Sequence, residues 1–116
     1  MDIYHGFFDL EDGQSDVEFA DALSGFLGHL LSAGKIESWR LMRRKLGLGP
    51  ATLGEFHLMI EVRDLAQLDA AFAKVSTRAG ETENRHAAVN QKIAGITFAL
   101  YRDFPDPHRQ RGEEKF

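Results

Sequence analysis

The chain has 116 residues, of which 43% are hydrophobic and 28% charged, and its net charge is −4. These values predict one folded domain spanning residues 1–116; they exclude a disordered chain and give no reason to expect binding to nucleic acid. The absence of cysteine excludes disulfides, thiolate metal sites and cysteine nucleophiles.

The sequence also lacks the signals of a membrane protein. No stretch approaches the roughly 18 apolar residues that a membrane span requires. The first residues do not combine a basic segment with an apolar one, so we expect no secretory leader and a cytoplasmic protein.

The first two predicted elements are a strand and a helix. Residues 1–10 are rich in Ile, Tyr and Phe and are mostly apolar on both faces, which favours a central strand. Ser15 and Glu18 have the spacing of a capping box, and they predict the start of a helix that ends at Gly34.

Two further strands follow. Residues 36–46 contain four basic side chains, which favour a solvated or ion-paired sheet edge over an anion site. These side chains are Arg40, Arg43, Arg44 and Lys45. Residues 55–64 alternate at period two. Their apolar face consists of Phe56, Leu58, Ile60 and Val62, and their other face of His57, Met59, Glu61 and Arg63. We expect helices to cover the apolar face.

The last part of the chain predicts two more helices and a strand. Asp64 can cap a second helix that ends near Gly80, and residues 81–92 predict a short third helix. Residues 95–103 form the last strand, and the proline-broken tail, 103–116, is irregular. This order predicts an α+β fold of the ferredoxin-like βαββαβ type, a four-stranded antiparallel sheet with its helices on one face.

The sheet face without helices is too apolar to remain in water. By the predicted register it carries Ile3, His5, Phe7, Arg40, Met42, Arg44, His57, Met59, Glu61, Thr97, Ala99 and Tyr101. A second copy, packed sheet against sheet, would bury the apolar side chains and enclose the polar ones. We therefore predict a homodimer.

The candidate site lies on the same face. A histidine in a partly dry pocket can act as a general base or acid near neutral pH, so we predict His57 or His5 as proton acceptor, with Tyr101 orienting a substrate. The residues predicted to contact that small-molecule substrate are Phe7, Arg40, Met42, Arg44, Met59 and Glu61. The alternative is that these polar groups only satisfy hydrogen bonds inside a dimer interface. Two histidines and a carboxylate can hold a metal, but no ligand spacing demands one, and we predict neither metal nor cofactor.

Three segments resemble a bacterial family of unknown function within the dimeric α+β barrel superfamily. They are residues 39–50, 55–57 and 97–106. The superfamily includes antibiotic-biosynthesis monooxygenases, polyketide and olivetolic-acid type cyclases, muconolactone isomerase, haem-degrading enzymes and stress-responsive proteins, so the resemblance implies the fold and the dimer but no single activity. It implies either a small-molecule-binding barrel, in the manner of a cofactor-independent monooxygenase, cyclase or isomerase, or a non-enzymatic stress-related or accessory dimer with a filled barrel.

Overall fold

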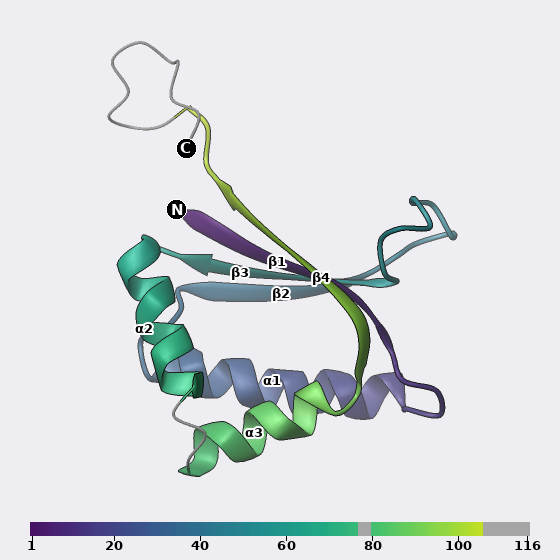
Figure 1. Ribbon diagram of the computed structural model, residues 1–116, viewed down its shortest axis with the longest axis horizontal. Coiled ribbons are helices and arrows are strands. Elements are labelled where there is room, and N and C mark those ends of the chain that lie inside the picture. The colour runs from purple at the N-terminus through teal and green to yellow at the C-terminus, as the bar shows by residue number, and fades with distance from the viewer. Residues whose placement is uncertain (77–79, 106–116) are drawn as a thin grey trace.

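The computed structural model describes residues 1–76 and 80–105, and within these residues it has the predicted order of elements. The strands are β1 (Asp2–Leu10), β2 (Ser38–Arg43), β3 (Phe56–Val62) and β4 (Ile93–Arg102), and the helices are α1 (Asp16–Ser32), α2 (Leu65–Ser76) and α3 (Gly80–Asn90). The strands form one antiparallel sheet in the order β2-β3-β1-β4, and the helices lie together on one side of it (Figure 1). The predicted α+β ferredoxin-like fold is confirmed.

Local signals explain the helices. The side chain of Ser15 accepts a hydrogen bond from the backbone N–H of Glu18 at 3.2 Å, which confirms the predicted cap of α1. Gly34 follows the helix with φ of 70°, a conformation that favours glycine. None of the helices in the described ranges is both long and apolar enough to cross a membrane.

The register of the sheet decides which side chains share a face. His5 of β1 lies opposite Met59 of β3 and Ala99 of β4, and Phe7 lies opposite His57. Because side chains alternate along a strand, one set points away from the helices. We call this surface the open face; it consists of Ile3, His5, Phe7, Ser38, Arg40, Met42, His57, Met59, Glu61, Thr97, Ala99 and Tyr101.

The opposite face of the sheet packs on the helices and forms the core. The largest side chains that are fully buried there are Phe8, Phe19, Leu23, Leu27 and Val62. The predicted central position of β1 and edge position of β2 are both confirmed.

The end of β2 differs from the prediction. The strand stops at Arg43, not at residue 46, and the following residues form the β2–β3 loop, 44–55. The guanidinium of Arg44 donates hydrogen bonds to the carbonyl oxygens of Pro50 at 2.9 Å and Leu53 at 2.7 Å. Arg44 therefore closes the loop on itself, and its predicted place in the strand is wrong. Of the predicted irregular tail, residues 106–116 lie outside the described residues.

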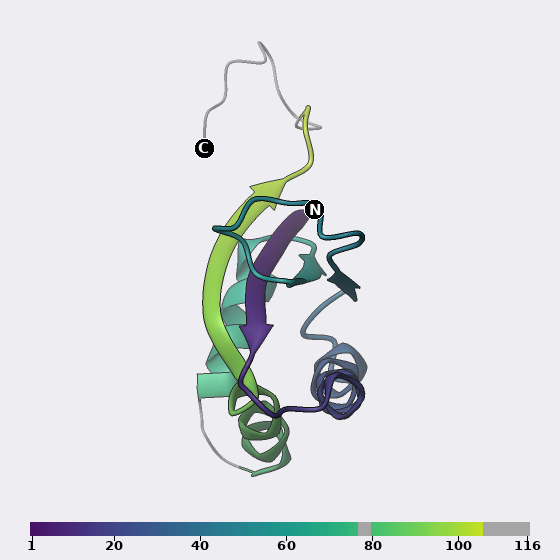
Figure 2. The same ribbon diagram turned by 90° about the vertical axis from the view of Figure 1, so that its right-hand side faces the viewer.

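The edge strand β4 bends toward α3 at its beginning, as Figures 1 and 2 show. Its register against β1 shifts between Phe7 and Asp9, and Gly95 has φ of 60°, so the backbone can turn there. The bend leaves a space between the sheet and the helices, bounded by Ile93 and Ile96 of β4.

Candidate functional site

Strand β1 separates two candidate sites because its side chains alternate between them. His5 points to the open face, whereas Tyr4 points toward the helices and lines the space beneath them. A molecule bound on one side of the sheet is therefore out of reach of polar groups on the other side.

On the open face, two histidines are in direct contact. The Nδ1 atom of His5 lies 2.8 Å from Nε2 of His57, so one ring donates a hydrogen bond and the other accepts it. The ring of Phe7 stacks on His57 at 4.2 Å, and the rings of Tyr101 and His5 make a T-shaped contact at 5.1 Å between centroids. The structure thus brings together the three side chains predicted to be catalytic.

Both histidines favour their neutral forms. Burial lowers the pKa of His5, because partial desolvation disfavours the imidazolium. Burial, and in addition the neighbouring His5, lowers the pKa of His57. A neutral pair can share the hydrogen bond between them, since each neutral ring has one donor and one acceptor nitrogen.

The other predicted contact residues are more scattered. Met59 lies opposite His5 in the register, with Arg40 on its other side, whereas Glu61 lies opposite Ile3. Neither Arg40 nor Arg44 forms an ion pair with Glu61 within residues 1–76 and 80–105.

Part of the basic run on β2 is ion-paired. Arg43 pairs with Asp16 at 2.8 Å and with Glu55 at 3.2 Å. This basic side chain therefore holds the end of β2 to the first turn of α1 and to the β2–β3 loop.

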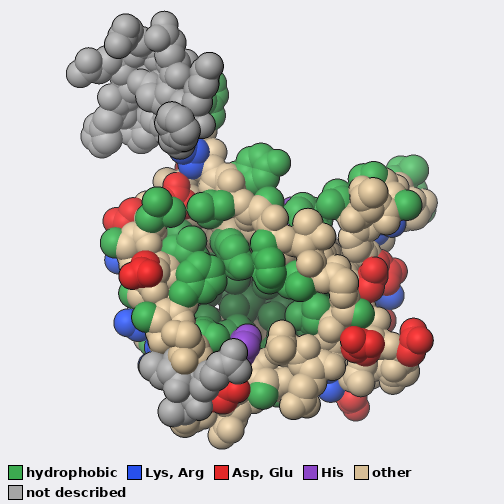
Figure 3. All heavy atoms as spheres, in the orientation of Figure 1, with side chains coloured by type: hydrophobic (Ala, Val, Ile, Leu, Met, Phe, Trp, Pro, Cys, Tyr) green, Lys and Arg blue, Asp and Glu red, His purple; other side chains and the backbone are tan. Residues whose placement is uncertain are grey.

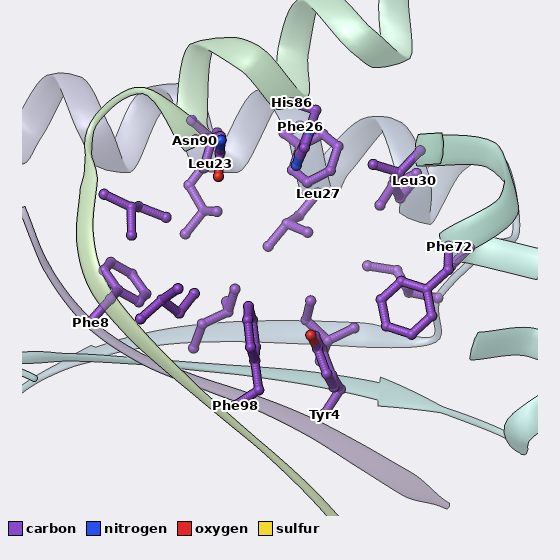
Figure 4. Close-up of a pocket in the computed structure, with 18 of the residues that line it drawn as sticks. Tyr4, Phe8, Leu23, Phe26, Leu27, Leu30, Phe72, His86, Asn90 and Phe98 are labelled. Atoms are coloured by element: carbon purple, nitrogen blue, oxygen red, sulfur yellow. The ribbon is translucent and has the colours of Figure 1, made fainter. Parts of the chain in front are cut away.

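The second candidate site is a cavity of about 280 Å³ between the sheet and the helices. In the space-filling view, hydrophobic side chains surround a hollow at this place (Figure 3). Its floor comes from the helix side of the sheet and its roof from α1, α2 and α3 (Figure 4). The lining includes Tyr4, Phe8, Leu27, Phe72, Val89 and Phe98.

Three aromatic rings form the wall near the mouth of this cavity. Tyr4 stacks on Phe98 and meets Phe72 edge to face, each at 5.4 Å between ring centroids. Phe72 and Phe98 are 47% and 55% exposed, which places them at the opening. Burial raises the pKa of Tyr4, so its hydroxyl keeps its proton and can act as a hydrogen-bond donor.

Polar groups enter the cavity from two sides. His86 and Asn90, one helical turn apart on α3, lie in its roof, and the hydroxyl of Tyr4 points up from the sheet (Figure 4). The ring of His86 lies 5.3 Å from that of Phe26, and its Nδ1 atom is 3.8 Å from Oε2 of Glu83.

Sequence reasoning did not single out these three polar residues. The i, i+4 spacing of His86 and Asn90 indicates only that both side chains lie on the same side of α3. Because α3 is polar, its pattern does not indicate which side of the helix faces the sheet.

The fold has counterparts among solved structures of low sequence identity. Protein At3g17210 from Arabidopsis thaliana matches with a TM-score of 0.71 and 7% identity, over 91% of this chain and 98% of that chain. A protein of unknown function from Jannaschia sp. CCS1, described as dimeric and ferredoxin-like, matches with a TM-score of 0.64 and 12% identity, over 89% and 100%. Another dimeric ferredoxin-like protein of unknown function, from Thermobifida fusca YX, matches with a TM-score of 0.59 and 14% identity, over 87% of this chain and 90% of that chain. At these identities the likeness establishes the fold alone.

No curated protein sequence matches the chain. The model of one protein family matches all of its residues, 1–116. The chain therefore belongs to the family of unknown function DUF6614.

Proposed function

We propose that the protein is a homodimer in which each subunit binds a small, largely apolar molecule between the sheet and the helices. The observation that carries this proposal is the apolar cavity of about 280 Å³ with polar groups at two of its walls. Ligand pockets combine such a lining with a few polar groups that fix orientation. A dry cavity of about 150 Å³ already accepts benzene, so a molecule of one or two rings is the expected size.

The energetic cost of an empty cavity supports this proposal. A void lowers stability by about 24 cal/mol per Å³, which gives roughly 7 kcal/mol for this volume as an upper bound, since water can enter through the mouth. Domains of this size are stable by only about 5–15 kcal/mol. The cost of the empty cavity is therefore large relative to the stability of the domain, and a ligand that fills the cavity offsets it.

A fluorescence titration with 6-propionyl-2-(dimethylamino)naphthalene, an uncharged dye of two fused rings, tests the cavity. Ala71 lines it, whereas Ala73 on the same helix is exposed, so the two alanines provide a matched pair. We expect one probe per subunit, at least tenfold weaker binding in Ala71→Leu, and unchanged binding in Ala73→Leu. Equal binding by both variants would place the probe outside the cavity and contradict the proposal.

The homodimer is supported by the open face and by two relatives in fold that are described as dimeric. Light scattering should give twice the mass of the chain. Met59→Glu puts a charge in the middle of the open face and should give a monomer, whereas Val17→Glu, at an exposed position of α1, should remain dimeric. A monomeric wild type would refute the dimer but leave the cavity in place.

A second candidate function rests on the 2.8 Å contact between His5 and His57. If a second copy covers the open face, this pair becomes a proton donor and acceptor enclosed between two sheets, with Tyr101 beside it. His57→Ala would then abolish turnover of a molecule held there, whereas in a purely structural interface it would change stability alone.

A further inference from the structure

We propose that His86 is a general base for the molecule in the cavity and that Glu83 positions it. The inference rests on the proposed binding function and adds a reaction class, the transfer of a proton within a small cyclic ketone. The cavity and the residues around it supply what such a step needs: a base, a group that orients the base, and a hydrogen-bond donor on the opposite wall.

The base is placed by α3. His86 is in the roof of the cavity, and its ring is tilted against the ring of Phe26 at 5.3 Å between centroids. Its Nδ1 atom faces Glu83, and Nε2 makes no hydrogen bond with the described residues. Nε2 is therefore the nitrogen left for a bound molecule.

The carboxylate of Glu83 lies in an unusual environment. Its Oε2 atom is shielded from solvent and accepts no hydrogen bond within the described ranges, although His86 Nδ1 is 3.8 Å away. A buried carboxylate oxygen without a donor is unfavourable. With Nε2 as the base, neutral His86 carries its hydrogen on Nδ1, the nitrogen that faces Glu83. Proton uptake at Nε2 turns the ring into a cation beside the carboxylate, so the carboxylate stabilises the product of proton abstraction. Catalytic hydrogen bonds are often long before the substrate binds.

The group on the opposite wall is Tyr4. Figure 4 shows its hydroxyl directed from the sheet toward the side of the cavity that carries His86. A protonated hydroxyl there can donate a hydrogen bond to a carbonyl oxygen and stabilise the charge that develops on it. A ketone between Tyr4 and His86 thus meets a donor at its oxygen and a base at the adjacent carbon.

The proposed step is balanced without a redox partner or cofactor. The C–H bond next to the carbonyl breaks, its proton passes to His86 Nε2, and its electron pair forms the enolate, whose oxygen accepts the hydrogen bond from Tyr4. Return of the proton, to the same carbon or to another carbon of a conjugated system, restores the neutral imidazole. The apolar lining selects an uncharged ligand of one or two rings.

Deuterium exchange of 2-tetralone in D₂O, followed by proton NMR, tests this step. General-base catalysis is worth about 10²–10⁴-fold, so we expect the wild type to accelerate exchange at least 100-fold over buffer and His86→Gln to return it to background. Glu83→Gln should slow exchange at least tenfold with an unchanged dissociation constant for the ketone, a separation that a merely structural role would not give. His29→Gln is the matched control, because His29 bonds Thr82 of α3 at 2.7 Å but does not line the cavity.

Binding of the ketone is measured separately, by displacement of the fluorescent probe, and folding of each variant by circular dichroism. A ketone that binds without accelerated exchange overturns the role of His86 and leaves the proposed binding function intact. Exchange that persists in folded His86→Gln overturns it as well. A ketone and a probe that both fail to bind refute the binding function, and the inference with it.

Discussion

Replacing Ala71 with leucine measures whether the space beneath α2 is empty in the free protein. The change adds three carbon atoms at a buried position that lines the cavity. Burial of each is worth about 0.8 kcal/mol, and ordering the leucine side chain costs about 0.5–1 kcal/mol. We therefore expect stabilisation by about 1.5 kcal/mol, a rise in Tm of roughly 6 °C for a domain of this length.

The sign of the effect makes this experiment decisive. In a well-packed core the same substitution forces neighbours apart and destabilises by about 1–3 kcal/mol. Urea unfolding at one fixed protein concentration, together with thermal unfolding, separates the two outcomes. Ala73→Leu on the exposed side of α2 corrects for the difference in helix propensity and should change stability by less than about 0.5 kcal/mol. A destabilised Ala71→Leu would show that the space closes in solution, and it would refute the cavity as a binding site.

Three other predictions concern the sheet and its loop. A Cβ atom at Gly54 would overlap the backbone carbonyl of Phe8, so Gly54→Ala should destabilise the protein by roughly 2 kcal/mol or more in urea unfolding, and a neutral effect would contradict this close approach. Arg44→Met removes the hydrogen bonds from the guanidinium to the carbonyl oxygens of Pro50, Leu53 and Gly54, so we expect a loss of about 1–2 kcal/mol and faster amide exchange in the loop. Unchanged exchange would show that Arg44 does not order the loop. Burial lowers the pKa values of His5 and His57, so the unfolded chain binds more protons than the folded protein once the pH falls below about 6.5, and the free energy of unfolding should decrease there. His57→Gln should weaken this pH dependence in urea titrations at a series of pH values. The same dependence in the variant would show that His57 does not contribute to it.

The two-residue alternation along the strands determined much of the architecture from sequence alone. Residues 55–64 can bury one apolar face only in a single register, and β1 is apolar on both faces, so the central strands and the open face followed directly. The capping pair Ser15 and Glu18 fixed the start of α1 in the same way. These signals are local or strictly periodic, and tertiary contacts reinforce them. The approach of His5 to His57 was therefore predictable from strand order.

The candidate cavity depended on the tertiary structure. Its volume is set by the distance at which three helices pack against a bent sheet, and the bend itself depends on a register shift between β1 and β4. The apolar side chain of Phe72 lies half exposed at the cavity mouth. The polar α3 has no apolar stripe strong enough to show which side turns inward, so His86, Glu83 and Asn90 gained a common location only when the helix was packed. Periodicity records which side chains avoid water, whereas a cavity results from how closely the packed elements approach one another, and that distance is encoded in no single segment.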